Sequence, residues 1–183
     1  MTTTVDAPSP HDPAEKFTLT AEYALRLNEV TFLSDNSVAL PWFAPDCRCY
    51  LPGRPVMDRH AFLDTVTMVM NAKPDVVLDL KDIFVDGNTA VVHATFTGHQ
   101  TGPLLGIPPT GRKVSITELG TVTFDDAGRV VEFRQEADYL GMLTQLGVVP
   151  PLGTGPLGQL AHSVRGAVRL YRLDRKHRKA TGR

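Results

Sequence analysis

The sequence of 183 residues contains only two cysteines, Cys47 and Cys49. Two cysteines are too few for a disulfide scaffold and do not by themselves complete a zinc site. No apolar run approaches the roughly 18 residues that a membrane-spanning helix needs. The opening residues, MTTTVDAPSPHDPAEK, have neither a basic start nor an apolar stretch, so we expect no secretory signal. A reducing cytoplasm is the expected location.

A strong net charge is also missing, because the formal total is −1. No overall field therefore attracts the chain to nucleic acid, and we expect no such partner. The charge is nevertheless divided: residues 151–183 hold eight Lys and Arg and a single acid, for a net +7, so residues 1–150 carry −8. A run rich in Pro and Gly at 150–156 separates the two. We expect a disordered segment at 1–17, a folded domain at 18–150 and a basic appendage at 151–183.

The hydrophobic pattern of the folded domain changes from a helical period to a strand period. Thr20 can cap a helix from Ala21 to about Leu33, and Asp58 can cap a second helix that stops at Lys73-Pro74. Four strands are expected next: Val76–Val85, Thr89–Gly98, Lys113–Phe124 and Arg129–Asp138. A short closing turn or helix is expected at Tyr139–Leu146. Helices followed by an antiparallel meander predict an α+β fold, with helices on one face of a curved sheet.

One acid falls on an apolar strand face. Glu118 alternates in phase with Val122 and Phe124, and burying a carboxylate there is costly unless it is paired, neutral or facing a cavity. The simpler alternative is an ion pair or a strand edge. If Gly128 closes a three-residue turn, Arg134 shares that face, and we expect a Glu118–Arg134 pair inside a cavity.

Asp138 ends the last strand immediately before apolar residues. Desolvation there would raise the pKa of its carboxyl and suit it to general acid/base work, whereas the alternative is that it only caps the following turn. His99 and Gln100 lie where another strand ends, at the expected opening of the pocket. The alternative for His99 is a surface or structural residue without a catalytic role. The loop GIPPTGRK at 106–113 is not a phosphate loop, because two prolines remove amide donors and Val114 follows the lysine.

Apolar residues and basic residues form two stripes in the appendage. The spacing predicts a basic amphipathic helix over 157–179, weakened by Gly166. Such a helix can pack on the acidic domain or on a second subunit, and contact with an anionic membrane or an acidic carrier protein stays open.

Two segments resemble a known family: TGHQTGPLLGIPPTGRKV at 97–114 and EADYLGMLTQLG at 136–147, with FAPD at 43–46 in support. They are similar to the SnoaL-like polyketide cyclases, or ester cyclases, of the nuclear transport factor two-like superfamily. The resemblance implies a cone-shaped α+β barrel with a deep apolar pocket, a polyketide-like small-molecule substrate and often a homodimer. It also implies no cofactor and no metal, with Asp138 as the acid/base of an intramolecular aldol ring closure.

The sequence departs from that family at pocket positions. Members often have His at the place of Gln100, Trp at Arg134 and a small residue at Glu118. We therefore expect a more polar pocket, lined by Glu118, Arg134, Gln100, His99, Phe124 and Val122. Alternatives are a related acid/base reaction (epoxide opening, cyclic ether formation or hydroxylation) and a ligand-binding or assembly protein without catalysis.

Overall fold

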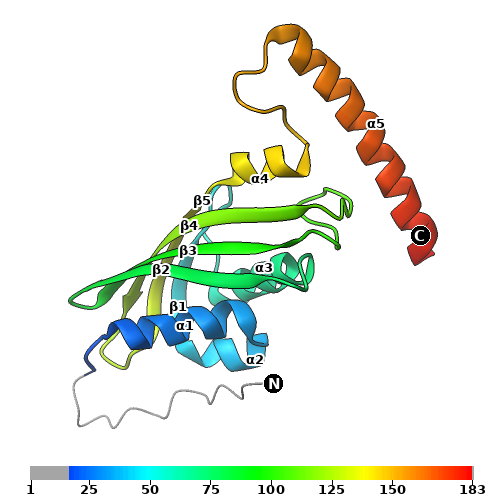
Figure 1. Ribbon diagram of the computed structural model, residues 1–183. Coiled ribbons are helices and arrows are strands. Elements are labelled where there is room, and N and C mark those ends of the chain that lie inside the picture. The colour runs from blue at the N-terminus through cyan, green and yellow to red at the C-terminus, as the bar shows by residue number, and fades with distance from the viewer. Residues whose placement is uncertain (1–16, 183) are drawn as a thin grey trace. The chain divides into compact units, whose positions relative to one another are not determined.

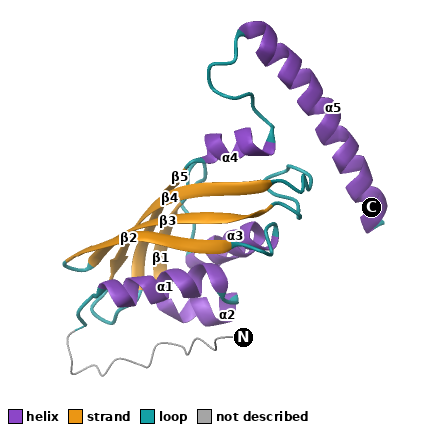
Figure 2. Cartoon of the chain, viewed as in Figure 1, coloured by secondary structure: helices purple, strands orange, loops and turns teal. Residues whose placement is uncertain are grey.

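The computed structural model describes residues 17–182 and has an α+β fold (Figures 1 and 2). The segment expected to be disordered, 1–17, lies outside the described residues except for Phe17. The helices are α1 (Ala21–Leu33), α2 (Asn36–Ala39), a 3-10 turn η1 (Leu40–Trp42), α3 (Arg59–Asn71), α4 (Tyr139–Leu146) and α5 (Pro156–Thr181). The strands are β1 (Phe43–Tyr50), β2 (Val77–Asp86), β3 (Thr89–His99), β4 (Lys113–Phe124) and β5 (Val130–Ala137).

The five strands form one curved sheet in the order β1-β5-β4-β3-β2 (Figure 1). The predicted α+β class and the expected run of strands from β2 to β5 are confirmed. Strand β1 adds a parallel partner on the far side of β5. Within the described residues β1 and β2 are the two outer strands, so the sheet is not closed into a barrel.

Side-chain caps begin α1 and α3 where the sequence predicts them. Thr20 Oγ1 accepts a hydrogen bond from the Tyr23 amide at 3.1 Å. Asp58 Oδ1 accepts from the amides of His60 and Ala61, each at 2.9 Å. These acceptors satisfy amides that a helix leaves unpaired in its first turn, and the two bonds to Asp58 lower the pKa of that carboxyl.

Aromatic contacts show which sheet face these helices cover. The Tyr23 ring in α1 lies 5.7 Å from that of Phe124, and the Phe62 ring in α3 lies 4.6 Å from that of Phe133. Val122 pairs with Phe133 across β4 and β5, and Phe124 is in phase with Val122, so all three share one face. Helices α1 and α3 therefore pack on the same face, which we call the helix-covered face.

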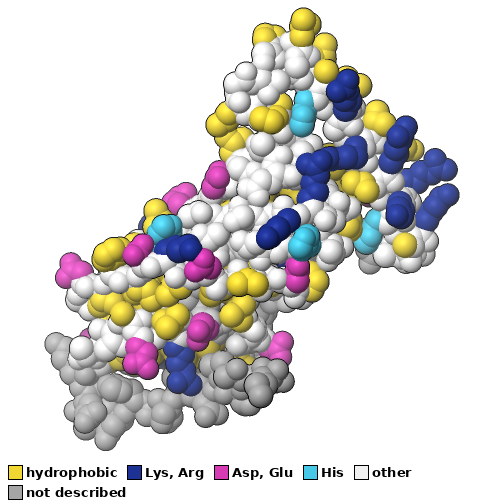
Figure 3. Space-filling view, in the orientation of Figure 1, with side chains coloured by type: hydrophobic (Ala, Val, Ile, Leu, Met, Phe, Trp, Pro, Cys, Tyr) yellow, Lys and Arg dark blue, Asp and Glu magenta, His cyan; other side chains and the backbone are white. Residues whose placement is uncertain are grey.

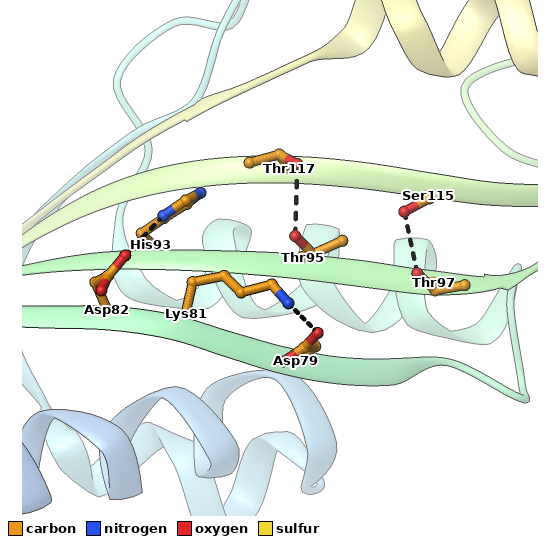
Figure 4. A network of polar contacts seen from close by, with 8 residues as sticks. All are labelled: Asp79, Lys81, Asp82, His93, Thr95, Thr97, Ser115 and Thr117. Carbon is orange, nitrogen blue, oxygen red and sulfur yellow. Dashed lines mark hydrogen bonds and ion pairs between the residues drawn. The ribbon is translucent and has the colours of Figure 1, made fainter.

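The other face of β2, β3 and β4 carries short polar side chains (Figure 4). Thr95 and Thr117 hydroxyls lie 3.5 Å apart, and Thr97 and Ser115 hydroxyls 3.1 Å apart. His93 Nδ1 lies 3.2 Å from an Asp82 carboxylate oxygen. This alternation of apolar and polar residues is that of a sheet with one packed face.

The chain forms two compact units that do not follow chain order. Of the described residues, the first unit contains 17–70, 78–95 and 117–137. The second contains 71–77, 96–116 and 138–182, so that α5 belongs to the same unit as α4 and the loop after β3.

Candidate functional site

Glu118 is the one carboxylate on the helix-covered face of β4, among the described residues. Its side chain is 6 % exposed, and the Gln135 amide donates a short hydrogen bond to Glu118 Oε2. The pairing of Gly120 with Gln135 places Gln135 diagonally across from Glu118 on the same face. Because an amide donor offsets part of the cost of burying a carboxyl group, this contact explains how Glu118 is accommodated.

The expected Glu118–Arg134 pair is wrong. The turn after β4 closes as predicted, with the Asp125 amide bonded to the Arg129 carbonyl at 2.8 Å. Beyond it the register shifts, because Phe124 pairs with Val130 whereas Thr123 pairs with Glu132. The extra residue, Val131, is a β-bulge, and one inserted residue moves every later side chain of β5 to the opposite face. Arg134 therefore does not line the helix-covered face.

Arg134 instead belongs to an exposed cluster on the other face. Its guanidinium carbon lies 3.8 Å from the centre of the Tyr50 ring, and its Nε donates to Glu132 at 2.9 Å. Tyr50 and Arg134 are register partners in the parallel pair of β1 and β5. Cation–π contact and an exposed ion pair explain the position of Arg134 without a ligand.

Polar groups of α1 and η1 are also buried. Asn28 and Thr31 are 5 % and 3 % exposed. Asn28 Oδ1, Thr31 Oγ1 and Trp42 Nε1 are buried with no hydrogen-bond partner among residues 17–182. Buried polar atoms normally have a partner in the protein or an ordered water, so these three are unpaired polar groups inside the first unit.

Asp138 lies in the second unit and caps α4. Its Oδ1 accepts a hydrogen bond from the Gly141 amide at 2.8 Å. A Cβ at position 141 would overlap the Asp138 carboxylate, which explains the glycine three residues after the aspartate. Within the described chain, Oδ2 has no hydrogen bond, and the residue is exposed. The capping alternative is thus observed, and it holds one oxygen while leaving the other available.

Gln100 is fully buried at the start of the loop after β3. Its Nε2 donates to the Gly102 carbonyl at 2.7 Å and to the Pro108 carbonyl at 3.1 Å. Its Oε1 accepts from both the amide and the hydroxyl of Thr110. These bonds to the loop engage the amide group completely, so Gln100 fixes the loop conformation.

His99 is exposed and joins β3 to the segment before β2. Its backbone amide donates to Asp75 Oδ1 at 2.7 Å, and its Nδ1 lies 2.6 Å from Asp75 Oδ2. The backbone bond first and the ring bond second lower the pKa of the Asp75 carboxyl. His99 therefore tethers the chain at Asp75.

Phe124 and Val122 are core residues of the first unit. Phe124 is 1 % exposed and packs against the rings of Phe17 and Tyr23, and Val122 is 2 % exposed. The Tyr23 hydroxyl donates to the Gly128 carbonyl at 2.8 Å, and burial, with the Asp125 charge, raises the pKa of this phenol. The structure thus brings Glu118, Val122 and Phe124 onto one face, while Asp138, Gln100 and His99 lie in the second unit.

Three interior groups escape prediction. Gln135 is the chain neighbour of Arg134, so the expected inward face for Arg134 would turn Gln135 away from Glu118. Asn28 and Thr31 lie three residues apart, and with Ala24 and Leu27 they form the buried stripe of α1. Polar residues at helical spacing inside an apolar stripe are the signal that could have identified Asn28 and Thr31.

In the described part of the chain, no three His, Cys, Asp or Glu side chains are placed to hold a metal ion. Cys47 Sγ and Cys49 Sγ lie 3.8 Å apart in the core. The contact with Cys47 and burial raise the pKa of Cys49. None of the described helices is both long and apolar enough to cross a membrane.

The sequence model of a family described as SnoaL-like polyketide cyclase matches residues 23–146, more than half of the chain. A protein from Jannaschia sp. CCS1, proposed to be such a cyclase, is 26 % identical with a TM-score of 0.66, over 77 % of this chain and 99 % of that one. IdmH from Streptomyces antibioticus, proposed to be a polyketide cyclase, is 28 % identical with a TM-score of 0.61, over 70 % and 98 %.

A third similar structure is AclR from Streptomyces galilaeus, proposed to be a hydroxylase. It is 24 % identical with a TM-score of 0.63, over 70 % of this chain and 96 % of that one, and it supports the fold alone. A search of curated proteins gives no match.

Proposed function

The chain belongs to the SnoaL-like polyketide cyclase family, whose members act on small polyketide molecules, and from this premise we propose that it is a cofactor-independent cyclase. The reaction is an intramolecular aldol closure of a polyketide-like carbonyl compound, with Asp138 as the acid/base. A homodimer, a cytoplasmic location and a role in antibiotic biosynthesis accompany this proposal as predictions.

The observation that carries the proposal is the state of the Asp138 carboxylate. The Gly141 amide donates a hydrogen bond to Oδ1, and Oδ2 accepts no hydrogen bond within residues 17–182. A carboxylate with one oxygen fixed and one available is oriented for proton transfer. The D-x-x-G spacing at 138–141 produces this arrangement from local sequence alone.

The proposed steps need one carboxylate. Asp138 Oδ2 removes a proton from a carbon flanked by carbonyl groups, and the substrate delocalises the resulting enolate. The enolate carbon bonds to a ketone carbon of the same molecule, whose carbonyl becomes an alkoxide. The Asp138 carboxyl then returns its proton to that oxygen, so the product is an isomer of the substrate.

The interior polar groups of the first unit support recognition of an oxygen-rich ligand. Glu118 with Gln135 offers a carboxyl and an amide on an otherwise apolar face. Asn28 and Thr31 add hydrogen-bonding atoms that no described residue uses. We propose that these groups bind the substrate's carbonyl and hydroxyl oxygens.

A second candidate function is ligand binding without turnover, and the exposure of Asp138 favours it. An exposed carboxylate is not activated by an apolar surrounding, and capping α4 is a sufficient structural role. On this reading the interior groups recognise a ligand that leaves unchanged.

The two functions are separated by incubating the purified chain, without added metal or cofactor, with polyketide methyl esters that carry a free β-keto side chain. Chromatography with mass detection measures conversion. The cyclase predicts a product of unchanged mass and different retention, formed faster than without protein. Saturable binding of the esters by calorimetry with no isomer formed would favour the second function, and neither binding nor turnover would contradict both.

A further inference from the structure

A cavity of about 420 Å³ in the second unit is lined by basic side chains. Its cationic lining consists of Arg112, Arg165 and Arg169, with the imidazole of His162. No carboxylate of residues 17–182 lies in this lining. None of the residues proposed above for catalysis and ligand recognition lines this cavity.

Two of these guanidiniums converge at the carboxyl end of α4. Arg112 Nη1 donates to the Gln145 carbonyl at 2.9 Å, and Arg169 Nη2 donates to the Leu146 and Gly147 carbonyls at 2.5 and 3.0 Å. A Cβ built on Gly147 would lie 2.7 Å from Arg169 Nη2 and 2.9 Å from Arg112 Nη1. Burial, followed by the charge of Arg112, lowers the pKa of Arg169. Two like charges are therefore held together at close range.

Capping of α4 explains part of this arrangement, because cations at a helix carboxyl end are favourable. It leaves other groups unexplained. Arg169 Nε and His162 Nε2 are buried and have no hydrogen-bond partner in the described chain. Arg165 also has no ion pair there. Buried polar atoms without a hydrogen-bond partner are costly, and each calls for one.

The rest of residues 151–183 adds further positive charge near the cavity and no free side-chain carboxylate to neutralise it. The single acid of residues 151–183, Asp174, is paired with Arg178 at 2.8 Å and does not line the cavity. Lys and Arg side chains gather over the α5 surface (Figure 3). The cavity therefore has an excess of donors and of positive charge, which an anion with several acceptor oxygens would match.

We infer that this cavity binds a phosphate group, carried either by a soluble phosphate compound or by a phospholipid headgroup. A phosphate presents three or more oxygens to donors arriving from different sides, whereas a carboxylate presents two. The lipid source is included because α5 has an exposed apolar stripe on the neighbouring face: Leu157, Leu160, Val164, Val168 and Tyr171. The inference does not depend on the proposed reaction.

Calorimetric titration of the full chain with inorganic pyrophosphate at low ionic strength tests the soluble source. Arg165→Gln removes a lining cation that bonds to nothing else described, and its matched control is Arg175→Gln, an exposed residue of the same helix outside the lining. We expect Arg165→Gln to weaken binding about tenfold or more and Arg175→Gln to change it about twofold at most. His162→Phe, which keeps a ring and removes its nitrogens, should weaken binding by a smaller factor.

Sedimentation with phosphatidylcholine vesicles, with and without phosphatidic acid, tests the lipid source using the same variants. Binding that requires phosphatidic acid and is lost in Arg165→Gln but not in Arg175→Gln assigns the site to a headgroup. Binding of pyrophosphate with that same selectivity assigns it to a soluble phosphate compound. The inference is overturned if neither probe binds, or if Arg165→Gln and Arg175→Gln lose binding equally while circular dichroism shows both folded.

Discussion

The two compact units differ in where they keep their polar groups. In the first unit, Glu118 and Gln135 bond to each other on a face covered by aromatic and aliphatic side chains. In the second, Asp138 and Arg165 are exposed, and the buried Gln100 is engaged by its own loop. The first unit therefore keeps this polar pair in its interior, whereas the second presents a carboxylate and a guanidinium at its surface.

This comparison also shows two different origins of a polar site. In the first unit the polar groups depend on strand register, which a single bulge determines. In the second unit they depend on short local motifs, such as the cap at Asp138 and the glycine at 141. Changes at register positions should therefore alter stability, and changes at local motifs should alter chemistry.

The largest stability effect is expected at the turn between β4 and β5. Gly128 has φ +75°, and a Cβ there would lie 2.9 Å from both Phe17 Cε2 and Tyr23 Oη. We expect Gly128→Ala to lower the free energy of unfolding by about 2–4 kcal/mol, because it adds a clash to left-handed backbone strain.

Gly87→Ala is the matched control, since Gly87 has φ +59° with open space around its Cβ position. Its loss should be about 1–2 kcal/mol, from backbone strain alone. Denaturant unfolding followed by circular dichroism measures both. Equal losses in the two variants would show that the contact with Phe17 and Tyr23 is unimportant.

A smaller effect tests the interior pair directly. Gln135→Leu removes the amide donor from the buried Glu118 carboxyl, and we expect a loss of about 1–3 kcal/mol in unfolding free energy. Arg134→Leu, one residue away on the exposed face, should cost no more than about 1 kcal/mol. The reverse order of the two losses, measured by the same denaturant titration, would mean that the assigned register of β5 is wrong.

The smallest effect is a pH dependence in the second unit. Hydrogen bonds from His99 lower the pKa of Asp75 in the folded chain below its value in the unfolded chain. The resulting stabilisation is present above the unfolded pKa and disappears as the pH falls through the folded pKa. Asp75→Asn should therefore flatten the acid side of the stability–pH curve.

Asp126→Asn, in an exposed turn, is the control and should leave the curve unchanged. Thermal unfolding midpoints from about pH 3 to pH 6, which spans ordinary carboxyl titration, provide the measurement. If the unfolding midpoint falls equally with pH in the native chain and in Asp75→Asn, the contact between His99 and Asp75 does not stabilise the fold.

Much of the fold follows from the sequence, because periods of 3.6 and 2 identify α1, α3 and strands β2 to β5. The phase of β4 also correctly places Glu118 on the same face as Val122 and Phe124, where all three are buried. The partner of Glu118 could not be predicted, since alternation alone does not reveal the bulge at Val131. The bonds of Gln100 were equally hidden, because they depend on how the loop at 101–112 folds back.

The candidate acid/base shows both sides of this limit. The sequence predicts the position of Asp138 at the end of β5, and it offers the capping of the following turn as an alternative role. The exposure of Asp138 could not be predicted from the sequence. The apolar residues that follow it belong to α4, and one of them, Leu140, is itself exposed. The apolar and basic stripes predict the basic helix α5. The cavity that α5 lines could not be predicted, because its other walls include Arg112 and Gly147 from distant parts of the sequence.

The most direct test of the acid/base role is the ring-closure rate of Asp138→Asn. The amide retains an oxygen that can accept from the Gly141 amide, so the cap and the fold should persist while the base is lost. We expect turnover to fall by about 10²–10⁴, with Glu136→Gln, an exposed residue of β5, retaining it. Turnover of Asp138→Asn equal to that of the native chain would contradict the assignment of Asp138 as the catalytic base.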